Sequence, residues 1–76
     1  MSSSYIVTLK SSATEDDIKK AAQDITENGG EVIRTFNSVI LKGLAAKIPD
    51  SYLDNFKSLN GDVVDFVEPD QQVHTQ

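Results

Sequence analysis

Few residues in this chain could support catalysis, and they are poorly placed for it. The 76-residue sequence contains one histidine, His74, and no cysteine. His74 lies two residues from the end of the sequence, where no scaffold would hold it as a general base or a metal ligand. Without a positioned base no serine is a credible nucleophile, and without cysteine there is no thiolate chemistry or cysteine zinc site. We therefore predict no enzyme activity and no catalytic residue.

Two further groups of residues could suggest ligand binding. Glu15, Asp16 and Asp17 could be taken for a hard-cation site, but carboxylates at the positive end of a helix dipole are the far commoner arrangement. Gly29 and Gly30 follow a predicted helix, whereas a phosphate-binding loop precedes one. We predict no metal and no cofactor.

The charge and composition exclude other partners. Twelve acidic and seven basic residues give a net charge of −5, which would repel a phosphate backbone, so we expect no nucleic acid. An RNA-binding sheet would need stacked aromatic residues on its central strands within a basic surface, and for that role the chain offers only Phe36 and Phe66 within an acidic one. No apolar stretch is long enough to span a bilayer, and no secretion signal is present. We expect one domain over residues 1–76, cytoplasmic, with no membrane contact and monomeric when free.

Hydrophobic periodicity predicts a strand and a helix in the first half of the chain. Residues 5–10 alternate, with Tyr5, Val7 and Leu9 on one face. Thr14 is the expected N-cap of a helix that ends at Asn28-Gly29-Gly30. Its apolar stripe has helical spacing and is rich in alanine: Ile18, Ala21, Ala22 and Ile25.

Two strands and a second helix are predicted next. In residues 31–36 we expect Val32 and Phe36 to face inward; Arg34 falls on the same side, which predicts a bulge, a sheet edge or a snorkelling side chain. Residues 39–48 form the third predicted strand, closed by Pro49. The second helix, capped by Asp50 or Ser51, ends at Asn60-Gly61, and its expected apolar face consists of Tyr52, Leu53, Phe56 and Leu59.

Residues 62–67 form the last predicted strand. Simple alternation does not fit the pair Val64 and Val67, or the pair Val63 and Phe66. The sequence therefore does not decide which side of this strand faces the core. The order β-α-β-β-α-β predicts an α+β, ferredoxin-like fold, with a four-stranded antiparallel sheet and two helices on one face. This fold hosts many functions and decides none of them.

The polar segment 68–76 follows the last strand. A tail without a core is expected to fray. An extended, uncharged end can equally be bound in a partner's groove by main-chain pairing, with alternate side chains in pockets. The residues alone leave these two interpretations at even odds.

The order and spacing of several short motifs resemble one known family. They are Tyr5-Ile6-Val7 with Leu9-Lys10, Gly29-Gly30 followed by Val32 and Phe36, Lys42-Gly43, and Val67-Glu68-Pro69-Asp70 running to Val73-His74-Thr75. Over nearly the whole chain this pattern is similar to the subtilisin propeptide-like inhibitors, which share their fold with the prodomains of subtilisin-type serine proteases. It looks closest to the small stand-alone intracellular inhibitors of vacuolar subtilisin-like proteinase.

The resemblance implies an inhibitor of a subtilisin-like serine protease. In such inhibitors the sheet face packs on two parallel surface helices of the protease, and the C-terminal tail occupies the substrate groove like a cleavage product. By position, Gln76 would fill the primary specificity pocket and Thr75, His74 and Val73 the next three subsites.

The resemblance also assigns Glu68 and Asp70 to the N-termini of the protease helices. On an extended segment these two side chains point the same way, and carboxylates accept the free N–H groups of helix N-termini. Pro69 stands where the family usually has a third acid, and whether it removes a sheet hydrogen bond is left open. Two alternative functions also stay open: a folding helper for such a protease, and an interaction module with no protease target.

Overall fold

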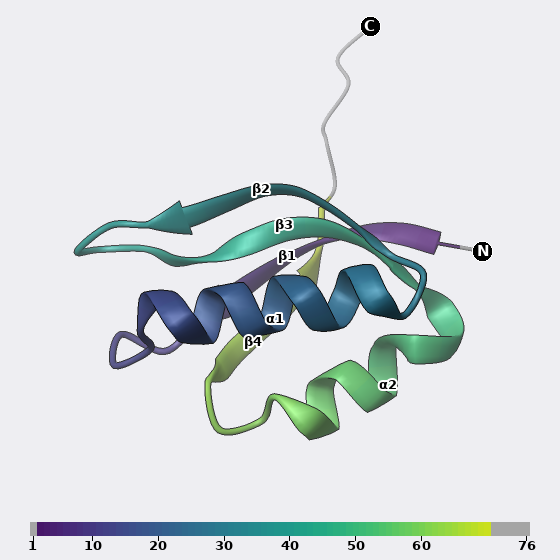
Figure 1. Cartoon of the computed structure of the whole chain (residues 1–76). Coiled ribbons are helices and arrows are strands. Elements are labelled where there is room, and N and C mark those ends of the chain that lie inside the picture. The colour runs from purple at the N-terminus through teal and green to yellow at the C-terminus, as the bar shows by residue number, and fades with distance from the viewer. Residues whose placement is uncertain (1, 71–76) are drawn as a thin grey trace, which may run out of the picture.

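The computed structural model describes residues 2–70. Its elements are β1 (Ser2–Leu9), α1 (Glu15–Glu27), β2 (Glu31–Asn37), β3 (Lys42–Pro49), α2 (Asp50–Leu59) and β4 (Val64–Pro69). The strands form one antiparallel sheet in the order β2-β3-β1-β4, and both helices lie on one side of it (Figure 1). The predicted ferredoxin-like α+β fold is confirmed.

A capping box starts α1. The Thr14 hydroxyl accepts the Asp17 backbone N–H at 3.2 Å, and the Asp17 carboxylate accepts the Thr14 N–H at 2.9 Å. These two bonds satisfy backbone donors that the first helical turn leaves unpaired. At the other end the helix stops at Asn28, and Gly29 reverses the chain with a φ of 91°. The predicted limits of this helix are confirmed.

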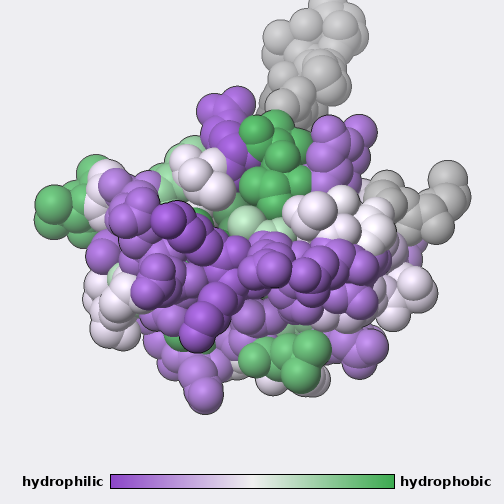
Figure 2. Space-filling view, in the orientation of Figure 1, coloured by the Kyte–Doolittle hydropathy of each residue, from purple (hydrophilic) through white to green (hydrophobic). Residues whose placement is uncertain are grey.

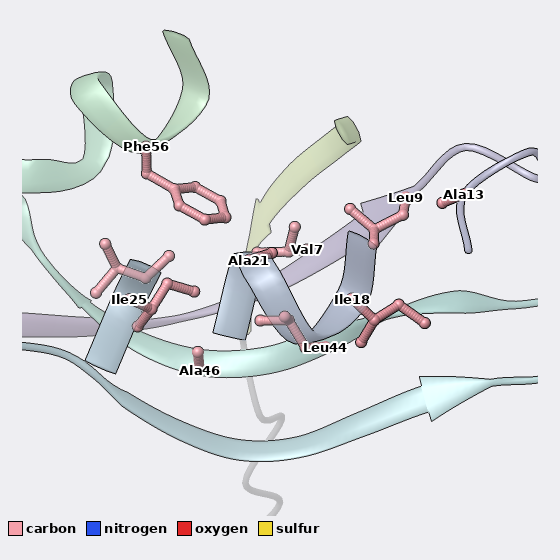
Figure 3. Packing of buried hydrophobic residues seen from close by; sticks show 10 residues of the cluster. Val7, Leu9, Ala13, Ile18, Ala21, Ile25, Leu44, Ala46 and Phe56 are labelled. Carbon is pink, nitrogen blue, oxygen red and sulfur yellow. The ribbon is translucent and has the colours of Figure 1, made fainter. Parts of the chain in front are cut away.

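The core lies between the sheet and the two helices. Its largest fully buried side chains are Phe56, Ile25, Leu44, Ile48 and Val7. Figure 3 shows Phe56 on α2 and Ile25, Ala21 and Ile18 on α1 directed toward the strands that carry Val7 and Leu44. Ala21 and Ala46 are both fully buried, and side chains this small allow the helix to approach the sheet closely. The predicted alanine-rich stripe therefore faces the sheet.

One predicted member of the apolar face of α2 is wrong. Phe56 is buried and Tyr52 and Leu53 pack against the core, but Leu59 is 71% exposed. Leu59 is the last residue of α2, and the next residue, Asn60, makes the contact with α1 by donating to Asp24 at 3.2 Å. A polar contact therefore closes this end of the helix pair.

The third strand begins later than predicted. β3 starts at Lys42, and the residues expected to open the strand, Val39 and Ile40, are 95% and 93% exposed. The cause is a turn closed by Ser38: its N–H donates to the Leu41 carbonyl at 2.9 Å, and its hydroxyl accepts the Leu41 N–H at 3.1 Å. These bonds remove the segment from the sheet's hydrogen-bond ladder.

A bulge in β2 changes which side chains face the core. Val32 pairs with Ala46 and Arg34 with the preceding residue, Ala45, so Ile33 is the extra residue. β2 is also an edge strand, so two of the three explanations offered for Arg34 hold. Because one inserted residue inverts the alternation, Phe36 lies on the opposite face from Val32. The prediction that Phe36 faces inward is wrong.

A second irregularity settles the inward face of β4. Phe66 pairs with Thr8 but Val64 pairs with Leu9, so Asp65 is the extra residue. Val64 and Val67 therefore both face the helices, opposite Leu9 and Val7. Phe66 faces the other way. The strand also extends to Pro69, two residues beyond its predicted end.

Candidate functional site

Within residues 2–70 one face of the sheet carries no helix, and it is built from three rows of residues that cross β4, β1, β3 and β2 in turn. We call this surface the open face. Its first row is Phe66, Thr8, Gly43 and Phe36; its second is Glu68, Ile6, Ala45 and Arg34; its third is Asp70, Ser4, Lys47 and Glu31. Asp70 belongs to the third row because its N–H donates to the Ser4 carbonyl at 2.9 Å.

The open face has an apolar centre with a charged border. Phe66 is 58% exposed, and Ile6 and Phe36 are partly buried. Ala45 is only 4% exposed although no helix covers it, because Ile6 and Arg34 flank it on the neighbouring strands. In the first row only Thr8 and Gly43 stand between the two phenylalanine residues, and both are small. A partner helix can approach such a surface closely.

Gly43 fits its position only as glycine. Its φ is 155°, and a Cβ there would lie 2.0 Å from the carbonyl oxygen of Val7. The close approach of β3 to β1 at this point therefore requires a residue without a side chain. The glycine also leaves the first row of the open face without a side chain at position 43.

Glu68 and Asp70 lie on the same face, as their two-residue spacing predicted. Glu68 pairs with Ile6 and Asp70 follows at Ser4, so both carboxylates border the open face where β4 ends. β4 ends at this border, and the chain continues from there into residues 71–76.

Pro69 between them removes no hydrogen bond from the sheet. Since Asp70 and Ser4 form a hydrogen-bonded pair, the next pair, Pro69 with Tyr5, is of the non-hydrogen-bonded type. The nitrogen of Pro69 therefore points away from β1, toward the free edge of β4. The doubt raised by the sequence is settled: proline stiffens the strand exit without breaking the ladder.

A hydrogen-bonded cluster on the other side of the molecule holds the helices together. The Asp24 carboxylate accepts the Tyr52 hydroxyl at 2.6 Å, and it accepts the side-chain amides of Asn60 and Asn28, both at 3.2 Å. Burial raises the pKa of Tyr52 to about 12, aided by the hydrogen bond and charge of Asp24 and the charge of Glu27. This cluster was not predicted; the spacing of Asp24 and Asn28 was its only sequence signal.

The structure places only part of the predicted site. Glu68 and Asp70 stand together on the open face, whereas Val73, His74, Thr75 and Gln76 lie outside the described residues, so their roles stay predictions. Within residues 2–70, no group of three or more histidine or acidic side chains could hold a metal ion. No helix in the same part of the chain has the length and apolarity needed to cross a membrane.

The fold and the open face define a binding module: a sheet backed by helices, with an exposed aromatic row and two carboxylates at the exit of its edge strand. Comparison with known protein families gives a match to peptidase inhibitor I9 over residues 4–76. The chain belongs to the peptidase inhibitor I9 family.

Individual relatives agree with this assignment. The chain is 36% identical over 76 residues to protease B inhibitor 2 and to protease B inhibitor 1 of Saccharomyces cerevisiae, covering 99% of each protein. It is 32% identical over 72 residues to the serine proteinase inhibitor IA-1 of Pleurotus ostreatus, with 95% of each chain covered. The predicted resemblance to the subtilisin propeptide-like inhibitors is confirmed, and the protein is a peptidase inhibitor, not an enzyme.

Proposed function

We propose that this protein inhibits a subtilisin-like serine protease by docking its open face on the protease and laying residues 73–76 in the substrate groove as a bound product. One observation carries the proposal. Glu68 and Asp70 border the same face as the Phe36–Phe66 row, at the end of the strand that leads into the tail. A single approach can therefore engage the sheet, the acidic pair and the tail together.

The open face supplies the apolar part of the contact. Phe66 and Ile6 are available for burial, and fully burying a side chain of this size contributes about 1.5–3 kcal/mol. Gly43 and Ala45 on β3 are small, so a pair of protease helices can come close to the sheet. The carboxylates of Glu68 and Asp70 accept hydrogen bonds from free N–H donors, and helix N-termini present such donors.

The tail supplies the contact with the catalytic groove. Extended segments bind such grooves by main-chain pairing, and alternate side chains enter the subsites. Val73 is the apolar residue of the set and the expected hydrophobic anchor, while Gln76 occupies the primary pocket. Glutamine suits a broad apolar pocket poorly, so we expect the other subsites to contribute more.

The decisive experiment is a titration of the full chain into subtilisin that is hydrolysing a peptide substrate. A variant that lacks residues 73–76 is the matched partner. We expect the full chain to inhibit stoichiometrically, and the truncated chain to lose most of the inhibition while unfolding at the same urea concentration. Full inhibition by the truncated chain would refute insertion of the tail, and no inhibition by the full chain would refute the protease target.

We also propose that the free inhibitor is monomeric and cytoplasmic. The absence of cysteine suits a reducing compartment, and the net charge of −5 opposes self-association. Sedimentation of the purified chain and fractionation of cells that express it test these two points separately.

A further inference from the structure

The turn between β2 and β3 exposes three consecutive aliphatic residues. Val39, Ile40 and Leu41, which we call the hairpin tip, are 95%, 93% and 40% exposed, and none belongs to the core or packs against it. In Figure 2 strongly apolar surface stands at the left end of the molecule, where Figure 1 draws this turn. Consecutive exposed aliphatic residues are unfavourable in water and commonly mark a contact surface.

The hairpin tip is held in one shape. Ser38 binds Leu41 through both its N–H and its hydroxyl, at 2.9 and 3.1 Å. At the base of the turn the Lys42 ammonium donates to the Ala13 carbonyl at 3.0 Å, which ties the hairpin to the loop before α1. A preorganised apolar loop loses little conformational entropy when a partner covers it.

The hairpin tip lies beyond the first row of the open face, at the end of β3 opposite the row of Asp70 and Lys47. The last pair of the hairpin, Asn37 with Lys42, adjoins the row that holds Phe36 and Gly43. The tail leaves from the row of Asp70 and Lys47, about 17 Å away along β3 at the usual rise per strand residue. The open face therefore lies between the aliphatic hairpin tip at one end and the exit of β4, with Glu68 and Asp70, at the other.

We propose that the hairpin tip is a second anchor on the target protease, bound to an apolar patch outside the substrate groove. This inference rests on the proposed function, because it takes the open face as the surface that meets the protease. Three exposed aliphatic side chains cover far less than the roughly 1,200–2,000 Å² that a stable interface buries, so the tip by itself cannot hold two copies of this chain together. It can extend an interface that the open face has already formed.

The expected effect is on the lifetime of the complex. Once the open face has docked, contact of the tip with the protease is intramolecular and adds affinity through effective concentration. Diffusional encounter precedes this contact. Loss of the contact between the tip and the protease should therefore raise the dissociation rate and leave the association rate nearly unchanged.

The test compares the wild-type chain with V39S/I40S in the inhibition of subtilisin. Because neither side chain is in the core, the variant should unfold at the wild-type urea concentration. We expect its inhibition constant to rise about tenfold or more, mainly through faster dissociation. Leu59→Ser is the matched control, since Leu59 is also exposed but lies on α2, on the helix side of the sheet, and it should inhibit like the wild type.

A second arm separates the tip from the tail. Both chains are shortened by residues 73–76 and their binding to subtilisin with a blocked catalytic serine is measured. A persisting tenfold difference supports an anchor outside the groove. Equal constants in either arm, or a wild-type dimer in sedimentation that V39S/I40S abolishes, would overturn the anchor while the proposed inhibition of a subtilisin-like protease stands. Failure of the wild-type chain to inhibit would overturn both.

Discussion

The Tyr52 hydroxyl on α2 donates a 2.6 Å hydrogen bond to Asp24 on α1. Asn60 reaches the same carboxylate from the far end of α2, so both ends of this helix are fixed to one acidic side chain. Within residues 2–70 both helices lie on the same side of the sheet, and this bond holds α2 there without using the open face. The contacts that hold the helix pair and the proposed contact surface are thus separate.

The raised pKa of Tyr52 predicts that the folded protein loses stability at high pH. The ordinary tyrosine pKa is about 10, and in the folded protein the pKa of Tyr52 is raised to about 12, chiefly by burial and then by Asp24. Between these values the folded state holds a proton that the unfolded state has lost. The free energy of unfolding should therefore fall as the pH rises from 10 to 12, and this contribution is fully present below pH 10.

Tyr52→Phe tests the prediction in urea unfolding curves. At pH 7 we expect a loss of about 1 kcal/mol, modest because the site is partly exposed, and between pH 10 and 12 a flatter decline than in the wild type. Tyr5→Phe, which leaves the contact with Asp24 in place, is the control for removing a tyrosine hydroxyl elsewhere. An unchanged alkaline slope in Tyr52→Phe would show that the titration of Tyr52 does not cause the loss of stability.

Gly43→Ala should be among the most destabilising single substitutions in the sheet. The backbone φ of 155° and the carbonyl of Val7 at 2.0 Å from the new Cβ both oppose it. We expect the free energy of unfolding to fall by about 3 kcal/mol or more. Gly61→Ala, whose new Cβ has its nearest contact at 3.4 Å, should change it by less than about 1 kcal/mol. Comparable values for the two would contradict the close approach of β3 to β1.

Glu68 and Asp70 should act together in binding. If their carboxylates accept N–H groups at helix N-termini of the protease, E68Q/D70N should weaken inhibition of subtilisin about tenfold and reduce its dependence on salt. Asp65→Asn removes a third acid from β4, at the extra residue of the strand, and should have little effect. An equal loss with Asp65→Asn would mean that total charge, and not the position of the pair, governs binding.

Folding stability should set how long inhibition lasts. Ile48 is fully buried, and Ile48→Val should lower the free energy of unfolding by about 1 kcal/mol, which raises the unfolded fraction about fivefold. Because cleavage follows the open population when refolding is fast, excess protease should digest the variant about fivefold faster while initial inhibition is unchanged. Leu59→Ala should behave like the wild type in the same time course. Equal persistence of Ile48→Val would disprove the coupling.

The sequence alone determined the order of the elements, the cap of α1 at Thr14 and the alternation of side chains along β1. Each of these depends on neighbouring residues: a capping side chain, an apolar period of two or of three to four, a glycine at a helix end. The same local motifs carried the resemblance to the inhibitor family, and they placed Glu68 and Asp70 on one side of an extended strand.

The tertiary structure alone decided which side chains form the open face. A strand can insert an extra residue only against a partner, and each insertion inverts every side chain beyond it. Ile33 and Asp65 are such residues: one turns Phe36 outward, and the other lets Val64 and Val67 face the core together. The exposed tip at Val39 and Ile40 likewise depends on where β2 and β3 stop pairing, which local propensity does not encode.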